Sequence, residues 1–257
     1  MLQSLKNISI FNNLGQDIAA PSHAYLFYGE DEVLNIELAK LFVASIFCGK
    51  SACLQCDACK RVDINKNPDL LIVDKPSLQV ADISNLIDNV QFKPMAYRHK
   101  IILITNAEGI NEPAQNKLLK TLEEPNPQVV FVLCCTNIEK LLPTIRSRLS
   151  KHYVANIDLS LVAEDLKSKG LNIDRFLHCD VSLTDTIKYS QDEGDAVLKQ
   201  VEQSIIQLKS SSDIPKVVSQ LKIKLEQRKE YLKLFLKAVD SALTNNQSVF
   251  SEQFIQH

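Results

Sequence analysis

The most specific stretch of the 257-residue sequence is Asn106-Ala-Glu-Gly-Ile-Asn-Glu-Pro-Ala-Gln-Asn-Lys-Leu-Leu-Lys-Thr-Leu-Glu-Glu-Pro125. It follows an apolar run and then takes up helical spacing, with Asn111 at the position of a helix cap. Pro113 falls in the first turn, where a missing N–H group costs little. Pro125 and Pro127 prevent the helix from continuing. The stretch therefore predicts the end of a strand, a capped helix and a sharp stop.

Apolar runs and helical segments alternate on both sides of this stretch. A helical pattern covers residues 33–46, and a second, amphipathic one has Val80, Ile83, Ile87 and Val90 on one face. Near-continuous apolar strands that alternate with helices are typical of a parallel sheet covered on both faces. We therefore expect an α/β domain, with strands over residues 24–28, 70–73, 101–104 and 129–133.

The strand signals stop after about residue 153. The pattern predicts short helices with polar joints over residues 156–194, and longer helices beyond, interrupted at residues 210–215. Apolar residues recur at helical steps between Val218 and Ala242, and such a stripe needs a partner surface. We therefore predict three domains, over residues 1–154, 155–194 and 195–257.

Composition limits the classes of function. The chain is 45% hydrophobic and 23% charged, with a formal net charge of −2 and a pI near 6.2. A stand-alone nucleic-acid binder usually carries a basic excess, so we expect DNA contacts only within a larger assembly. The N-terminus lacks the basic head and apolar stretch of a signal peptide, and no run of about 18 apolar residues occurs. These features predict a cytoplasmic protein with no membrane contact.

Three motifs follow one another along the chain. Residues 23–29 are His-Ala-Tyr-Leu-Phe-Tyr-Gly, residues 116–125 are Asn-Lys-Leu-Leu-Lys-Thr-Leu-Glu-Glu-Pro, and residues 142–148 are Leu-Pro-Thr-Ile-Arg-Ser-Arg. Together they resemble the bacterial clamp-loader AAA+ proteins, the gamma/tau and delta-prime subunits of DNA polymerase III. The resemblance implies an AAA+ RecA-like parallel-sheet domain with a zinc module. It also implies a small helical lid domain over residues 155–194 and a C-terminal helical collar domain over residues 195–257.

In that family a phosphate-binding loop of pattern G-x-x-x-x-G-K-[ST] follows the first strand. Its backbone N–H groups wrap the phosphates, its lysine neutralises them and its hydroxyl holds magnesium. Here only Gly29 remains, while Leu34, Asn35 and Ile36 replace the second glycine, the lysine and the hydroxyl residue. Carboxylates also stand where phosphates would lie, and they occupy the anion-binding end of the helix dipole. These carboxylates belong to Glu30, Asp31 and Glu32. We expect no ATP binding at this degenerate loop.

Two other parts of the family's ATPase site are altered as well. The acidic motif after the third strand should end in adjacent carboxylates that position magnesium and water. Uncharged Thr105 and Asn106 occupy those positions, and only Glu108 follows. In the lid the family's ATPases carry Gly-Ser-x-Arg, whereas residues 181–184 are Val-Ser-Leu-Thr. Loss of ATP hydrolysis is the simplest explanation of all three changes.

Arg148 ends the third motif, where the family carries Ser-Arg-Cys. The family's arginine enters the ATP site of the neighbouring subunit as a trans-acting arginine finger, and such a residue contributes about 10³–10⁵ to the rate of phosphoryl transfer. The resemblance implies this role for Arg148, although a surface ion pair is the commoner role of an arginine. Leu149 replaces the family's cysteine, and Arg146 lies close by in the sequence.

Four of the seven cysteines form the cluster Cys48-x4-Cys53-x2-Cys56-x2-Cys59. In a reducing compartment such a cluster indicates metal binding rather than disulfides. Four thiolates suit tetrahedral zinc and leave no open position, so we expect a structural site. Successive C-x2-C steps also suit an iron–sulfur cluster, and four unligated thiols are a third interpretation. Clamp-loader AAA+ domains carry a zinc module at this place, with a longer first gap, so the resemblance favours structural Zn²⁺.

These features predict a non-catalytic clamp-loader subunit of the delta-prime type. The resemblance implies gamma/tau and delta subunits as partners in a hetero-pentamer, with the sliding clamp and primed DNA reached through the complex. Two other interpretations stay open. An active, ATP-hydrolysing gamma/tau-type motor conflicts with Leu34, Asn35 and Ile36. A zinc-dependent interaction protein unrelated to replication leaves the motif over residues 116–125 unexplained.

Overall fold

The computed structural model describes residues 3–190, except residues 9, 12, 13, 50, 172 and 174–181. The chain divides into two compact units, Met1–Ile157 and Asp158–His257. The predicted collar over residues 195–257 lies outside the described residues, and the predicted domain boundaries stay predictions. Within the described part of the chain, no helix has the length and apolar character that crossing a membrane requires.

The first unit is built on a five-stranded sheet of order β2-β3-β4-β1-β5, in which every neighbouring pair is parallel. The α/β domain with a parallel sheet that the sequence predicts is therefore confirmed. The strands are β1 (Ala24–Tyr28), β2 (Leu70–Val73), β3 (Lys100–Ile104), β4 (Val129–Cys135) and β5 (Ser150–Tyr153).

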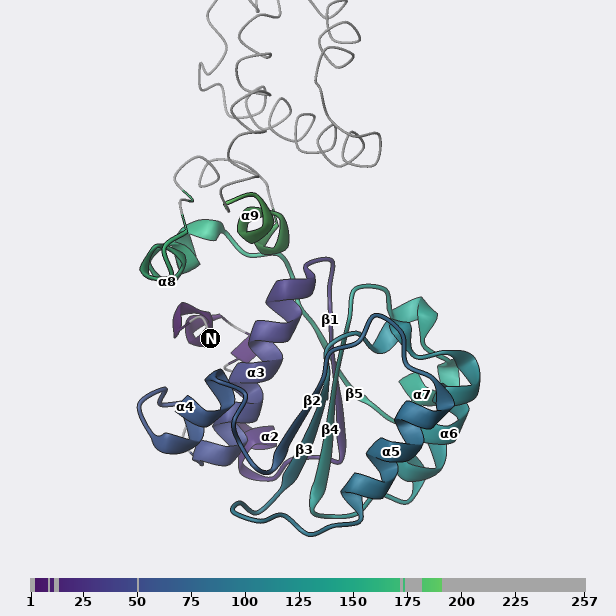
Figure 1. Ribbon diagram of the computed structural model, residues 1–257. Helices are drawn as coiled ribbons and strands as arrows, with labels where there is room; N and C mark the ends of the chain where they lie inside the picture. Colours follow the sequence, from purple (N-terminus) through teal and green to yellow (C-terminus); the bar gives the residue numbers. More distant parts are fainter. Residues whose placement is uncertain are drawn as a thin grey trace, which may run out of the picture. The chain divides into compact units, whose positions relative to one another are not determined.

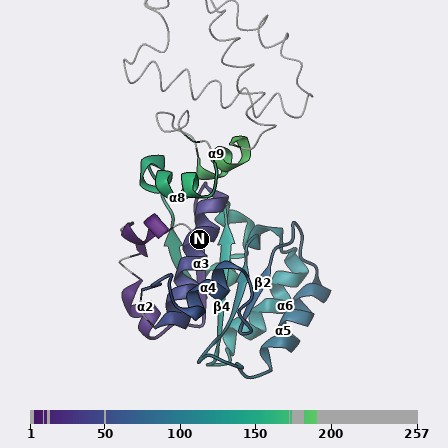
Figure 2. The same cartoon turned by 60° about the vertical axis from the view of Figure 1, so that its left-hand side comes forward.

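Helices cover both faces of this sheet, as Figures 1 and 2 show from two directions. One face carries α2 (Gly15–Ala19), α3 (Glu32–Cys48) and α4 (Asp57–Asp63). The other face carries α5 (Val80–Val90), α6 (Glu112–Glu123) and α7 (Pro143–Arg146). Short 3-10 helices complete the described part of the unit: η1 (Gln3–Asn7), η2 (Ala107–Gly109) and η3 (Ile138–Lys140).

Strand β1 shows how the apolar runs form a two-sided core. Successive side chains of a strand point to opposite faces. Ala24 and Leu26 are fully buried in the core that α5 and α6 cover. The rings of Tyr25 and Phe27 instead meet Phe42 of α3, with ring centroids 4.6 and 5.6 Å apart. Burial on both faces explains why the sequence of this strand is a continuous apolar run.

The helix starts follow local capping chemistry. The side chain of Asn111 accepts a hydrogen bond from the backbone N–H of Ala114 at 2.9 Å, so the predicted cap of α6 is confirmed. The predicted amphipathic helix is α5, and Val80, its first residue, is 39% exposed. Leu86 is buried, together with Ile83.

The described part of the second unit is helical. It consists of η4 (Leu159–Val162), α8 (Ala163–Ser168) and α9 (Leu183–Tyr189). Ser182 begins α9 as its cap, and its Oγ accepts a hydrogen bond from the backbone N–H of Asp185 at 3.0 Å. The serine that aligns with the family's lid motif therefore has a local role in starting a helix.

A buried carboxylate organises the loop that leads into β3. Asp69, fully buried just before β2, accepts hydrogen bonds from three consecutive backbone N–H groups. These belong to Met95, Ala96 and Tyr97, at 2.6, 2.7 and 2.8 Å. One side chain thus fixes a segment that lies at least 26 positions further along the chain.

We expect Asp69→Ala to lower the free energy of unfolding by about 3 kcal/mol, because three part-buried N–H groups lose their shared acceptor and each hydrogen bond contributes about 1 kcal/mol. Urea denaturation measures this change. Asp88→Ala, at an exposed position of α5, is the control and should shift stability by less than about 0.5 kcal/mol. Equal stabilities for the two variants would contradict the anchoring role of Asp69.

Candidate functional site

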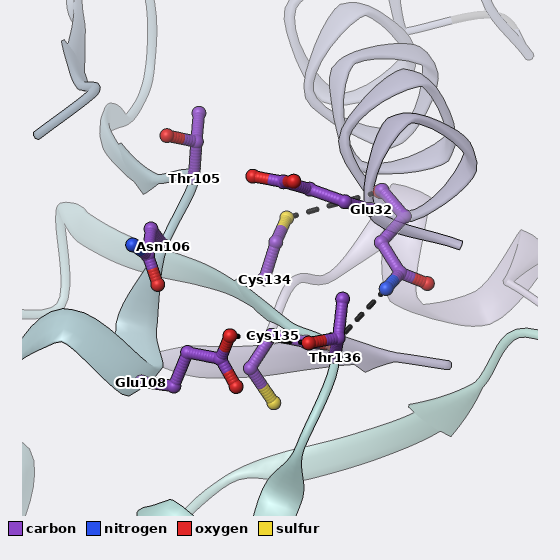
Figure 3. A pocket seen from close by; sticks show the side chains of 8 residues that line it. Glu32, Thr105, Asn106, Glu108, Cys134, Cys135 and Thr136 are labelled. Atoms are coloured by element: carbon purple, nitrogen blue, oxygen red, sulfur yellow. Dashed lines mark hydrogen bonds between the residues drawn. The ribbon is translucent and has the colours of Figure 1, made fainter. Parts of the chain in front are cut away.

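The altered phosphate loop lies at the carboxyl end of the sheet, where open parallel sheets bind their ligands. Figure 3 shows the small pocket that remains there. About 10 Å³ of it is open to the centre of a water molecule, which is roughly the space that one water needs. The pocket is lined by Glu32, Asn35, Thr105, Asn106, Glu108, Cys134, Cys135 and Thr136.

A helix occupies the place of the loop. Helix α3 begins at Glu32, so Leu34, Asn35 and Ile36 lie in its first turns rather than in a segment that wraps an anion. The buried carboxylate of Asp31 accepts the backbone N–H of Leu34 at 3.1 Å, and the Asp31 carbonyl accepts that of Asn35 at 3.0 Å. N–H groups at a helix start that would otherwise face a phosphate are thus satisfied within the chain.

Asn35 aligns with the lysine of the family's phosphate loop, and its side-chain amide forms hydrogen bonds within the protein. Its side chain is almost fully buried, and Nδ2 donates to the carbonyl oxygens of Gly29 at 2.8 Å and Cys135 at 3.0 Å. The first acceptor follows β1 and the second ends β4. A neutral amide thus ties α3 to two strand ends.

The retained glycine is explained by packing. A Cβ atom at Gly29 would lie 2.1 Å from the carbonyl oxygen of Val154, the residue that follows β5. No side chain fits at such a distance, because the contact is with backbone rather than with a flexible side chain. Gly29 is therefore required by the fold itself and carries no information about phosphate binding.

Thr105 and Asn106, which the resemblance aligns with the family's magnesium-binding motif, directly follow β3. The hydroxyl of Thr105 donates to the carboxylate of Asp74 at 2.7 Å. The side-chain oxygen of Asn106 accepts the backbone N–H of Gly109 at 3.1 Å. Neither side chain offers the adjacent negative charges that hold a hard cation beside a triphosphate.

Glu108 extends toward the end of β4 (Figure 3). Its carboxylate accepts the hydroxyl of Thr136 at 3.1 Å and the backbone N–H of Asn137 at 3.0 Å. Glu32 adds a second carboxylate to the pocket. Burial raises the pKa of the Cys135 thiol to about 12, and the charge of Glu108 acts in the same direction. The pocket therefore combines a protonated thiol with two carboxylates, and that of Glu108 lies 3.9 Å from Nζ of Lys140.

Arg148 lies in the turn after α7, and neighbouring residues of this turn pack in the core. Its backbone N–H donates to the carbonyl of Ile145 at 3.0 Å, and Ile145 and Leu149 are buried in the core. The guanidinium is one-third exposed, with Nη2 2.6 Å from a carboxylate oxygen of Glu123 and Nη1 2.7 Å from the carbonyl oxygen of Thr144. Leu149, which replaces the family's cysteine, thus fills the core and supports the turn.

Helix α6 positions this turn through a buried glutamine. Gln115 donates from Nε2 to the carbonyl of Lys140 at 3.2 Å and accepts the backbone N–H of Leu142 at 2.8 Å. The segment that leads into α7 is therefore held by the motif helix. The nearby Arg146 forms a different ion pair, with Glu139 at 2.6 Å.

The four clustered cysteines converge on one point. Their sulfur atoms all lie within 4.8 Å of one another. Cys48 ends α3, Cys56 caps α4 and Cys59 lies in the first turn of α4. The Sγ of Cys48 is 3.5 Å from that of Cys53 and 3.7 Å from that of Cys56. Four sulfurs about 2.3 Å from a central ion are about 3.8 Å apart in a tetrahedron, so the cluster can hold a metal ion.

The backbone between the first three of these cysteines adopts an uncommon conformation. Ala52 and Leu54 have φ angles of 40° and 61°, a left-handed conformation that is uncommon for residues other than glycine. The backbone N–H of Cys56 points at the Sγ of Cys53 at 3.4 Å and lowers the pKa of that thiol to about 6. Burial raises the pKa of the Cys59 thiol. The thiolate is the form that binds metal, so Cys53 is predisposed as a ligand.

The parallel sheet, covered by helices on both faces, defines an α/β protein. Over residues 7–158, more than half of the chain, the sequence matches the family model described as DNA polymerase III, delta subunit. The chain therefore belongs to this family of bacterial clamp-loader subunits.

Individual relatives carry names from the same complex. The chain is 37% identical over 149 residues to DNA polymerase III subunit tau/gamma of Haemophilus influenzae, which covers 56% of this chain and 22% of the relative. It is 33% identical over 178 residues to subunit delta' of Bacillus subtilis, which covers 67% of this chain and 50% of the relative. The chain thus spans about a fifth to a half of the length of these two relatives.

A solved structure shares the fold. The crystal structure of a DNA polymerase III gamma subunit-related protein from Thermotoga maritima matches with a TM-score of 0.52 and 21% identity. The match covers 95% of this chain and 74% of the other.

The structure places the predicted site residues at three separate positions: the strand-end pocket, the cysteine cluster and the turn after α7. The sequence analysis missed Gln115 and Glu123, whose partners lie 25 or more positions further along the chain. One signal for Glu123 was present. Glu123 and Glu124 put two carboxylates at the C-terminal end of a helix, where the helix dipole disfavours negative charge.

We expect Cys53→Ser to lose most of its bound metal in competition with a chelator, because three thiolates leave the tetrahedral shell incomplete. Elemental analysis after dialysis measures the loss, and the unaltered protein should retain about one ion per chain. Cys135→Ser is the control, since this thiol ends β4 and lies outside the cluster. Equal metal contents in the two variants would contradict the site.

Proposed function

We propose that this chain is a non-catalytic clamp-loader subunit of the delta-prime type, which assists the ATP-driven loading of the sliding clamp onto primed DNA during replication. The observation that carries the proposal is the start of α3. The helix begins at Glu32, capped by Asp31, and the amide of Asn35 bridges two strand ends where a phosphate loop would open. This arrangement supports the proposal, because the described residues that follow β1 form a helix start held by bonds within the chain.

In this proposal the chain works in the cytoplasm within a hetero-pentamer of gamma/tau and delta subunits. Residues 155–194 form the lid domain, and residues 195–257 form the collar that joins the neighbouring subunits. The sliding clamp and primed DNA are reached through the complex, in keeping with the formal net charge of −2. Family membership supports the assembly.

Arg148 is the residue through which the chain acts on its neighbour. Its guanidinium is partly exposed at the end of a turn whose base is buried, so the side chain can reach outward while its backbone stays in place. At the adjacent ATP site its positive charge would stabilise the charge that develops on the transferred phosphoryl group.

The alternative is an ATP-hydrolysing motor of the gamma/tau type. The 37% identity to the tau/gamma subunit of Haemophilus influenzae favours it. Leu34 and Asn35 argue against it, because a fully buried leucine and a buried amide replace the glycine and lysine that hold phosphates. The two carboxylates of the pocket, Glu32 and Glu108, argue in the same direction.

For the cysteine cluster we propose structural Zn²⁺, held by Cys48, Cys53, Cys56 and Cys59. An iron–sulfur cluster distributes its four thiolates over two or four irons, so that some of the sulfurs lie further apart than around a single ion. Here all four sulfurs lie within 4.8 Å of one another. Sulfur separations of 3.5 and 3.7 Å favour a single tetrahedral ion. With all four positions taken by thiolates, the ion would link the end of α3 to the start of α4 and take no part in catalysis.

We expect the purified chain to show no heat of ATP binding above background in isothermal titration calorimetry with magnesium present. Asn35→Lys alone should not restore binding, because the helix still begins at Glu32 and Leu34 still occupies the core. A gamma/tau subunit measured in parallel is the positive control. Tight, magnesium-dependent binding by the unaltered chain would overturn the proposal in favour of the motor.

We expect Arg148→Ala to lower the ATPase rate at the neighbouring site of the reconstituted loader by about 10³-fold or more, the contribution of an arginine finger. Single-turnover hydrolysis measures the rate, and size-exclusion chromatography should show that the complex still assembles. Arg146→Ala, which removes the arginine that pairs with Glu139, is the matched control and should leave the rate near that of the unaltered loader. An unchanged rate for Arg148→Ala would remove this residue from its role.

A further inference from the structure

We propose that Glu123 is a latch that holds the tip of Arg148 until the charge that develops on the phosphoryl group transferred from a neighbouring subunit's ATP displaces it. The inference rests on the proposed role of Arg148 as a trans-acting finger, and it adds a positioning residue that the family motifs do not indicate. Glu123 ends the helix of the motif over residues 116–125, and it meets Arg148 across 25 positions of sequence.

The terminal nitrogens of Arg148, which can bind a phosphate, form hydrogen bonds within the chain. An arginine binds phosphate through the N–H groups of its planar guanidinium, most strongly through two of them at once. In Arg148 the Nη2 atom lies 2.6 Å from Oε1 of Glu123, and the Nη1 atom donates to the carbonyl oxygen of Thr144 at 2.7 Å. Both terminal nitrogens are therefore engaged within the chain, and a two-point contact with a phosphate through Nη1 and Nη2 requires that these bonds be released.

The charge of Glu123 is unfavourable for its own helix. It is the last residue of α6, and Glu124 follows as the C-terminal cap. The C-terminal end of a helix carries a partial negative charge, so carboxylates there are destabilising. Lys120 in the last turn offsets only part of this charge. Residues that break a local rule are expected at functional positions, and here the negative helix end forms a site for the guanidinium of Arg148.

The ion pair between Arg148 and Glu123 is weak enough to open. The side chains of Arg148 and Glu123 are 33% and 49% exposed, so solvent screens their attraction. Exposed ion pairs of this kind are weak, and a triphosphate with several negative charges competes with a single carboxylate. The pair therefore restrains the arginine before hydrolysis and yields in the transition state, where negative charge develops on the transferred phosphoryl group of the neighbour's ATP.

The test compares Glu123→Gln with Glu124→Gln in the reconstituted loader. The two variants remove the same charge from the same helix end, but only the first removes the ion pair to Arg148. Hydrolysis is measured without clamp and DNA over a range of ATP concentrations. We expect Glu123→Gln to raise kcat by about 1.5- to 5-fold, the factor that corresponds to an exposed ion pair, with KM unchanged. Glu124→Gln should leave both parameters close to those of the unaltered loader.

Two further variants show whether the effect passes through Arg148. Glu123→Gln should have no effect in a chain that already carries Arg148→Ala. Glu123→Asp keeps the charge on a shorter side chain and should give an intermediate kcat, which guards against poor folding of the glutamine variant. A kcat that falls in Glu123→Gln, or equals that of Glu124→Gln, overturns the latch. If Arg148→Ala alone leaves hydrolysis unchanged, the proposed function itself has failed, which is a separate outcome.

Discussion

The backbone of Gly29 lies against that of Val154, so closely that a Cβ atom at Gly29 would stand 2.1 Å from a carbonyl oxygen. The same two segments are joined by a hydrogen bond from the N–H of Val154 to the carbonyl of Tyr28 at 2.8 Å. This approach fixes where β1 ends relative to β5 and leaves only a tight connection into α3. The positions of Asp31 and Asn35, and with them the chemistry of the strand-end pocket, follow from that constraint.

Within this constraint, Asn35 shows how a ligand site becomes part of the core. A lysine at this position would need an anion beside it, since a buried charge without a partner is strongly unfavourable. The neutral amide instead donates to Gly29 and Cys135, two carbonyl groups already present at the strand ends. Leu34, Asn35 and Ile36 all lie in the first turns of α3, where Leu34 packs in the core and Asn35 bonds to the strand ends.

Features encoded by neighbouring residues could be predicted from the sequence. The bounds of β1 and β2 agree with prediction to the residue, because each is an apolar run between polar or turn residues, and Asn111 caps α6 as expected. The convergence of the four cysteines also follows from their spacing. Contacts between distant segments could not be predicted in this way. Asp69 contacts partners at least 26 positions away, and Glu123 contacts one that is 25 positions away. No local pattern states which distant residue each of them will meet.

The strand-end pocket and the turn that carries Arg148 depend on different layers of the molecule. The pocket is shaped by the start of α3, on one face of the sheet, whereas Arg148 is placed by α6 and α7 on the other (Figure 1). Gln115 holds the segment before α7, and Ile145 and Leu149 anchor the turn in the core that α5 and α6 cover. None of these supports comes from α3. Changes at the start of α3 are therefore expected to leave the turn that carries Arg148 undisturbed. Under the proposed function, this separation is a physical reason why a subunit without a nucleotide site of its own would still act on that of a neighbour.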